Sequence, residues 1–390
     1  MLKFKRQGVD LLKSVKILHC ADVHIGALEN FLGEKAVSRR FETLSTFEKI
    51  IDTAAEKGSE LLLIAGDLFD SDSVEDSLVR PVLGKIASVP QIKVIYAAGN
   101  HDPLNINSPF NNKKYALPQN LFVLGTEDDC KNFEELGVRV YGRSFESVYM
   151  QGRERFSLSV PDDDFVNIMV LHGELRSDLN SNYNSVTREF IERCGIDYIA
   201  LGHIHKFSGI GELSGTFYAY PGCPEGQGFD ELGEKGVISG VISRGSCELE
   251  FVPTAKRMHS EESIDISGLA GTAEIYEKII SDVKEKYGES FGENLYKFIL
   301  KGTPAFDGAV NTAELTVKLS GVTYYAKVKD CTDPVFDGKA LESELSLKGL
   351  FYKTMKKRIE TADPGERETL EKALYLGLRA FTGEVTCDED

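Results

Sequence analysis

Residues 15–26 read Val-Lys-Ile-Leu-His-Cys-Ala-Asp-Val-His-Ile-Gly, a short apolar run that passes into Asp22 and His24. Four later runs have the same form and also lead into Gly, Asn, Asp or His: residues 60–65, 92–98, 166–171 and 197–201. Between the runs lie amphipathic segments such as residues 40–57, whose apolar side chains recur at helical spacing. Short buried strands that alternate with helices predict an α/β domain.

The ends of these five runs carry side chains that a stable fold does not require. They are of types that bind metals or transfer protons: Asp22, His24, Asp67, Asn100, His101, His172, His203 and His205. Strand ends at the carboxyl edge of an α/β sheet converge in space. We therefore expect these side chains to lie close together.

The chemistry of this set favours a site for two metal ions. Without His101, seven nitrogen and oxygen donors remain, which exceeds the needs of one ion and suits two. Mixed imidazole and carboxylate ligands without sulfur favour manganese, iron or zinc over copper(I) and calcium. Two such ions about 3.5–4 Å apart are a common arrangement for attack on a phosphate ester. One carboxylate has to bridge them, and we expect Asp67, on the central strand, to do so.

The composition bounds the class of protein. The chain has 390 residues, 42% hydrophobic and 27% charged, and contains no run near the roughly 18 apolar residues that a membrane helix needs. Seven scattered cysteines without a C-x-x-C pair favour a reducing cytoplasm over a disulfide framework. The net charge of −17 divides into −9 over residues 1–260 and −8 over the rest. An unaided, sequence-independent grip on DNA is therefore not expected.

The later part of the chain has a different pattern. Its strand-like pieces are residues 215–220, 237–242, 295–300, 315–319 and 322–328. The first two read like strands of a second sheet, and the last three form a small α+β unit with a helix over about residues 272–287. From about Leu341, two amphipathic helices are predicted on either side of the turn at residues 363–365.

The polar strand ends resemble those of the calcineurin-like metallophosphoesterases in order and approximate spacing. The five motifs are Asp22-Val-His24, Gly66-Asp67, Gly99-Asn-His-Asp102, His172-Gly173 and Gly202-His-Ile-His205. More narrowly, residues 17–26, 63–70, 200–206 and 220–222 resemble SbcD-type DNA repair exonucleases. The stretch Cys223-Pro-Glu-Gly-Gln-Gly-Phe-Asp230 is similar to the YhaO-like branch of that group.

The resemblance implies a role for each matching residue. The first metal would be held by Asp22, His24, Asp67 and His205, and the second by Asp67, Asn100, His172 and His203. The position of His101 implies contact with the scissile phosphate and help to the leaving oxygen, with Asp102 in support. The metal in this family is usually manganese.

The resemblance also implies a fold and partners. The fold is a two-sheet sandwich flanked by helices, followed by a capping domain that selects DNA. The expected segments are a leading segment 1–14, a catalytic domain 15–258, an α+β capping domain 259–335 and a helical pair with an acidic tail 336–390. SbcD-type nucleases pair with an SbcC-type coiled-coil ATPase, which we expect to bind the C-terminal helices, and dimers are common among them.

The function expected from these observations is metal-dependent hydrolysis of DNA phosphodiester bonds by a cytoplasmic repair exonuclease. An endonuclease activity is compatible with the same site. One alternative is a phosphodiesterase for cyclic nucleotides or other small phosphodiesters. A second is a non-catalytic scaffold that has lost its chemistry, although none of the expected ligand positions is substituted.

Several other reactive side chains have a simpler interpretation. We expect His19 to be packed inside the first strand and His259 to be exposed near the change in pattern. Asp70 and Asp72 are expected in a solvated loop, and the thiol of Cys223 is expected to be buried and inert.

Overall fold

The computed structural model describes residues 13–150, 156, 158, 160–176, 181–306, 310–332 and 337–381. Most of the predicted leading segment and the acidic tail from residue 382 lie outside the described residues. The chain forms two compact units, residues 1–259 and 260–390, and each is described by itself.

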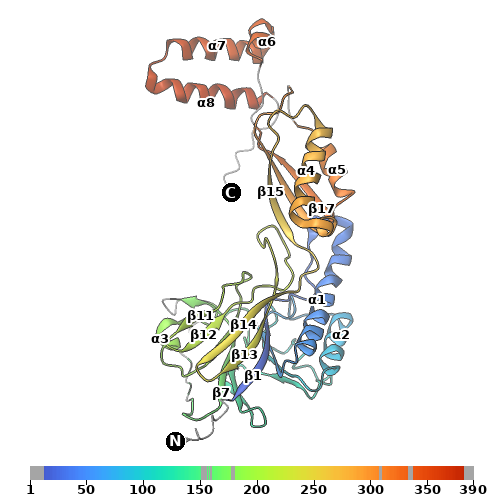
Figure 1. The fold of residues 1–390 in the computed structure, drawn as a ribbon, viewed down its shortest axis with the longest axis vertical. Helices are drawn as coiled ribbons and strands as arrows, with labels where there is room; N and C mark the ends of the chain where they lie inside the picture. The colour runs from blue at the N-terminus through green and yellow to red at the C-terminus, as the bar shows by residue number, and fades with distance from the viewer. Residues whose placement is uncertain are drawn as a thin grey trace, which may run out of the picture. The chain divides into compact units, whose positions relative to one another are not determined.

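The first unit contains two six-stranded sheets, labelled in part in Figure 1. In the first sheet the strand order is β14-β13-β1-β2-β3-β4. Its strands are β1 Ser14–Cys20, β2 Leu61–Ala65, β3 Lys93–Ala97, β4 Leu121–Val123, β13 Gly236–Ser243 and β14 Ser246–Pro253. Strands β1 to β4 run parallel, and β13 joins β1 in the antiparallel sense.

The second sheet has the strand order β11-β12-β10-β7-β6-β5. Its strands are β5 Asp129–Phe133, β6 Val138–Arg143, β7 Val166–His172, β10 Tyr198–Gly202, β11 Gly211–Leu213 and β12 Thr216–Ala219. The four central strands are parallel, and an antiparallel strand closes each edge. A short parallel pair, β8 Leu175–Arg176 and β9 Val186–Thr187, stands apart from both sheets.

Both faces of the first sheet are covered, which explains why its strands read as continuous apolar runs. Ile17 and Leu63 belong to a buried cluster that they share with Ile168 and Val170 of the second sheet. The neighbouring positions turn to the other face, because side chains alternate along a strand. That face packs against helices α1 Ala36–Glu56 and α2 Asp76–Ala87. The predicted two-sheet fold flanked by helices is confirmed.

Two expectations for this unit are wrong. Residues 237–242 are expected in the second sheet, but they form β13 and extend the first sheet through six successive pairs with β1. His259 is expected to be exposed, but it is buried, with Nε2 3.4 Å from Glu29 Oε2 and its ring against Phe229. Both errors concern long-range partners, which the local pattern does not reveal.

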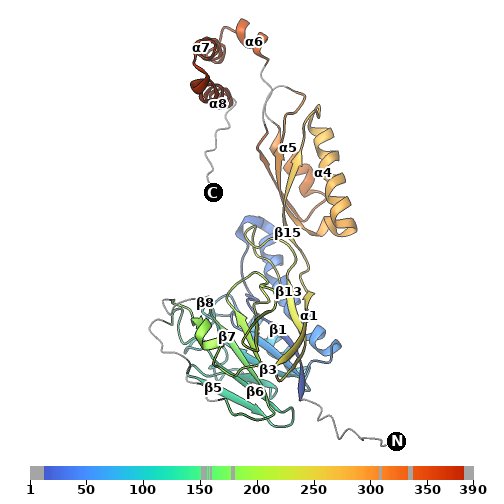
Figure 2. The ribbon, with the colours of Figure 1, turned by 60° about the vertical axis from the view of Figure 1, so that its left-hand side comes forward.

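The second unit begins with a three-stranded sheet of order β15-β16-β17. Its elements are β15 His259–Asp265, α4 Thr272–Tyr287, the 3-10 helix Gly288–Glu293, β16 Leu295–Lys301, α5 Thr312–Ser320 and β17 Tyr325–Asp330. The two helices lie side by side along this sheet in both views (Figures 1 and 2). Their buried residues share one core with the sheet.

Helix α5 corrects the expectation of a strand at residues 315–319. Asn311 caps it, since its side chain accepts a hydrogen bond from the Glu314 N–H at 3.1 Å. Leu315 and Leu319 are both fully buried, which is the i, i+4 spacing of one helix face. The run of apolar and β-branched residues is too short to distinguish the two possibilities by period alone.

Three helices end the described chain: α6 Gly338–Ser343, α7 Leu347–Thr361 and α8 Pro364–Ala380. Helices α7 and α8 form an antiparallel hairpin (Figures 1 and 2). Met355 and Leu378 are buried, and the Phe351 and Phe381 rings meet at 5.7 Å. No helix among the described residues is long and apolar enough to span a bilayer.

Candidate metal centre

The predicted ligands come from the carboxyl ends of five strands that belong to both sheets. In the first sheet, Asp22 follows β1, Asp67 follows β2 and Asn100 follows β3. In the second sheet, His172 ends β7, while His203 and His205 follow β10. The strand ends of one sheet therefore face those of the other, and neither sheet alone holds the set.

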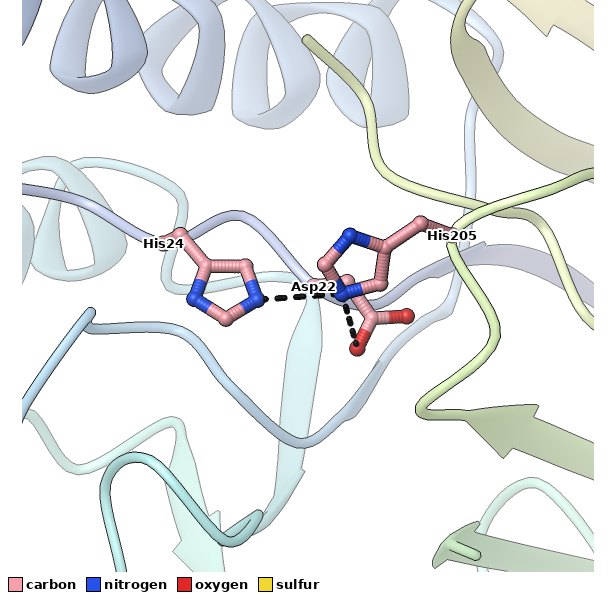
Figure 3. Close-up of side chains that lie close together, drawn as sticks. All are labelled: Asp22, His24 and His205. Carbon is pink, nitrogen blue, oxygen red and sulfur yellow. Dashed lines mark hydrogen bonds and ion pairs between the residues drawn. The ribbon is translucent and has the colours of Figure 1, made fainter. Parts of the chain in front are cut away.

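One cluster consists of Asp22, His24 and His205, whose rings and carboxylate Figure 3 shows turned toward one another. The two Nε2 atoms of the histidines are 3.3 Å apart. His205 Nε2 lies 3.9 Å from Asp22 Oδ1. Asp22 and His24 are buried, so this cluster is sheltered from water on the side of the first sheet.

The hydrogen bonds behind the two rings fix which nitrogen faces the cluster. His24 Nδ1 lies 3.2 Å from Asp70 Oδ1, and His205 Nδ1 contacts Glu231 Oε1. Carboxylates only accept, so each Nδ1 donates its proton and a neutral ring presents a lone pair on Nε2. Two lone pairs 3.3 Å apart repel unless a cation or a proton lies between them. The donor set therefore fits a cation.

A second cluster surrounds His172, which is fully buried. Its Nδ1 faces the Ala65 carbonyl at 3.0 Å and donates to it. Its Nε2 lies 2.9 Å from Asn100 Oδ1 and 3.3 Å from Asp67 Oδ2. Three acceptor atoms again face one another, and this second set also fits a cation.

Asp67 lies between the two clusters. Its Oδ2 is 3.7 Å from His24 Nε2 on one side and 3.3 Å from His172 Nε2 on the other. Its Oδ1 accepts the His101 N–H at 2.9 Å, which holds the carboxylate in this orientation.

His203 lies beside the second cluster. Its ring centre is 5.1 Å from that of His172, and its backbone N–H donates to both Asp22 oxygens at 3.0 and 3.1 Å. Its Nε2 lies 3.3 Å from Glu174 Oε1, and the Tyr183 ring packs on it at 4.4 Å.

Backbone strain concentrates at the same residues. Within the described part of the chain, five residues other than glycine have a positive φ: Asp22, His24, Asp67, His203 and Ser214. Four of the five are predicted ligands. A positive φ is unfavourable for these residue types and persists where the surrounding structure imposes it, most often at functional sites.

Close backbone packing also holds the clusters. A Cβ at Gly202 would lie 1.8 Å from the Ala65 carbonyl oxygen, which is the contact between the two sheets at the site. At Gly66, whose φ is +88°, a Cβ would lie 2.3 Å from His172 Nδ1. Only glycine lets the strand ends approach this closely.

The charges around the clusters favour cationic occupants. Burial by itself would lower the pKa of His24, but Asp70 and Asp67 outweigh it and raise that pKa to about 9. The pKa of His205 is also raised against its burial, by Glu231 and Asp22. Groups that hold protons this firmly also attract divalent cations, which compete for the same lone pairs.

His101 and Asp102 occupy different surroundings. The His101 side chain is 47% exposed, and its Nδ1 lies 3.2 Å from the Asp70 carbonyl oxygen. Asp102 is buried and accepts the N–H groups of Phe69 and Gly99, each at 2.9 Å. Asp102 thus joins the loops after β2 and β3 and acts on His101 through the backbone.

Three carboxylates at the site are not among the predicted site residues. Asp70, expected in a solvated loop, contacts the His24 ring, whereas Asp72 accepts from Asn105 at 2.8 Å. Glu174 and Asp70 follow predicted ligands by two and three residues, so proximity in sequence could have suggested them. Glu231 comes from a distant loop and no motif marks it.

Comparison with known families matches residues 15–207 to the calcineurin-like phosphoesterases. Among curated proteins, the chain is 25% identical over 307 residues to the uncharacterized metallophosphoesterase YhaO of Bacillus subtilis, covering 75% of this chain and 73% of that protein. It is 23% identical over 371 residues to the DNA double-strand break repair protein Mre11 of Methanopyrus kandleri, covering 88% and 77%. Over 93 residues it is 34% identical to the SbcD component of the SbcCD nuclease of Rhodobacter capsulatus, which covers 23% and 22%.

The first unit thus contains a calcineurin-like metallophosphoesterase domain, and the resemblance seen in the five motifs is confirmed. The chain is a hydrolase of phosphodiester bonds, from a family that works with divalent metal ions.

Proposed function

We propose that this enzyme is a DNA exonuclease that uses two divalent ions, with manganese as the working metal. The observation that carries the proposal is the position of Asp67 Oδ2, between His24 Nε2 and His172 Nε2. Two ligand sets that share one carboxylate oxygen suit a dinuclear phosphoesterase. The names of the Mre11 and SbcCD relatives support DNA as the substrate. A cytoplasmic location is in keeping with its free cysteines.

In this proposal the residues divide the work. Asp22, His24, Asp67 and His205 would hold one ion, and Asp67, Asn100, His172 and His203 the other. When bound, the ions supply charge stabilisation for the phosphoryl oxygens and lower the pKa of a water.

His101 would act directly on the substrate. Because its Nδ1 faces the Asp70 carbonyl, its Nε2 is free to approach the phosphate and to donate a proton to the leaving oxygen. Asp102 would keep His101 in place through the Gly99 and Phe69 backbone.

A nuclease assay tests the substrate. Single- and double-stranded DNA, labelled at one end, are incubated with the full-length protein and manganese, and 3′,5′-cyclic nucleotides are tested in parallel. We expect shortened DNA with manganese and intact DNA with chelator. Hydrolysis of the cyclic nucleotide with intact DNA would favour the small-phosphodiester alternative. Two bound metal equivalents without hydrolysis of either substrate would favour the scaffold.

The C-terminal hairpin is the proposed contact with an SbcC-type ATPase. The predicted stripes divide in the structure, since Met355 and Leu378 are buried but Leu347 and Leu350 are 71% and 60% exposed. Two exposed leucines on one helix, a turn apart, form an apolar surface of the kind that a partner groove covers.

Changing those two leucines tests the contact without removing the hairpin. The double variant Leu347→Glu, Leu350→Glu should fold normally, because both side chains already lie in water. We expect it to lose co-purification with the co-expressed ATPase while it keeps metal content and hydrolysis of a small phosphodiester. Val317→Glu, at a 74% exposed position on α5, is the matched control and should retain the partner. Full retention of the ATPase by the double variant would contradict the proposed contact.

A further inference from the structure

The loop that follows β12 holds His205 from the side opposite the metal cluster. Glu231 Oε1 accepts a hydrogen bond from His205 Nδ1, and the Glu231 side chain is only 11% exposed. Lys235 Nζ donates to the His205 carbonyl at 2.9 Å, so both the ring and the backbone of His205 are held. A Cβ at Gly222 would lie 2.9 Å from the same carbonyl oxygen, and its φ is +77°.

Glu231 is itself held in one orientation. Its Oε2 accepts the Gln227 N–H at 2.8 Å and the Cys223 thiol at 3.3 Å. Each carboxylate oxygen thus has a donor of its own. The bond to His205 is therefore part of a built arrangement and not a chance contact of two surface side chains.

The three histidines that face Asp22 or Asp67 share this arrangement. Each has an acceptor behind Nδ1: Asp70 for His24, Glu231 for His205 and the Ala65 carbonyl for His172. An acceptor at that position selects the tautomer with a lone pair on Nε2 and fixes the plane of the ring. Without Glu231, His205 could rotate or carry its proton on Nε2, and neither form binds a cation in the cluster.

We propose that Glu231 is a positioning residue that sets the tautomer and ring orientation of His205 and thereby the affinity of one of the two metal positions. This rests on the proposed function to the extent that His205 must be a metal ligand. It assigns a role to a residue outside the five motifs.

The test measures metal affinity in Glu231→Gln and Glu231→Ala. An amide has one acceptor oxygen, so the glutamine of the first variant would present a donor either to His205 Nδ1 or to the Gln227 N–H. Glu234→Gln, an exposed carboxylate on the same loop, is the matched control. Manganese is titrated into each metal-free, full-length protein, and free ion is counted by electron paramagnetic resonance. The melting temperature of each metal-free variant is recorded beside it.

We expect one of the two equivalents to bind about 10- to 100-fold more weakly in both Glu231 variants, with the other equivalent and the control unchanged. Excess manganese should restore occupancy by mass action. Wild-type affinity at both positions in both variants would overturn the proposal. So would equal weakening at both positions with a lowered melting temperature, because that is the result of a purely structural role. If Glu231→Ala does not fold, Glu231→Gln decides between these outcomes.

The result is separable from the choice of substrate. A wild-type protein that binds two manganese ions but leaves DNA intact would refute the nuclease and leave the affinity comparison valid. A wild-type protein that binds no manganese would refute both.

Discussion

Replacing Asp67 by asparagine is expected to empty both metal positions and to reduce phosphodiester hydrolysis to the level seen with chelator. The reason is the position of Oδ2, 3.7 Å from His24 Nε2 and 3.3 Å from His172 Nε2. Asparagine keeps the size of the side chain and an oxygen that can accept the His101 N–H. It removes the negative charge that both ions would share.

Elemental analysis of the purified protein measures this effect. Asn100→Ala is the comparison, since Asn100 contacts His172 and should cost mainly one equivalent. Circular dichroism of both variants checks that the fold is kept. Two full equivalents of metal in Asp67→Asn would show that Asp67 is not the bridge.

Replacing His101 by alanine should leave metal content and DNA binding unchanged but slow cleavage by about 10²–10⁴-fold. The imidazole is exposed at the rim, and only the backbone N–H of His101 contacts Asp67. Removal of the ring therefore leaves the carboxylate in place while the proton donor to the leaving oxygen is lost.

A substrate with a good leaving group separates the two roles of His101. Nitrophenolate leaves without a proton, so bis(p-nitrophenyl) phosphate should lose much less rate than DNA in His101→Ala. An equal loss on both substrates would favour charge stabilisation of the phosphate over proton transfer. Loss of a metal equivalent would mean that His101 is a ligand, and the assignment would be wrong.

The parts of the site that could be predicted are those that local sequence encodes. Asp22, Asp67 and Asn100 each follow an apolar run directly, so the strand and its terminal ligand are read together from one short stretch. The convergence of strand ends is a general property of parallel sheets. Their backbone strain is not visible in this way, because a positive φ at Asp22 or Asp67 arises from the contacts around it.

The errors have a common cause in long-range pairing. The strand at residues 237–242 is recognisable from its own residues, but its partner β1 lies more than 200 residues earlier in the chain. The polar neighbours of His259 suggest exposure, whereas Glu29 and Phe229 bury it. Residues 315–319 resemble a strand because five residues are too few to establish a period.

The sequence by itself determined the family, the two-sheet fold and the identity of the candidate ligands, because ligand type and strand pattern are properties of short segments. Only the tertiary structure decided which nitrogen of each histidine faces the site. That choice depends on acceptors such as Asp70, the Ala65 carbonyl and Glu231, and Glu231 lies 26 residues from the ring that it holds. A hydrogen bond between distant segments exists only once the chain has folded, so no local pattern encodes it.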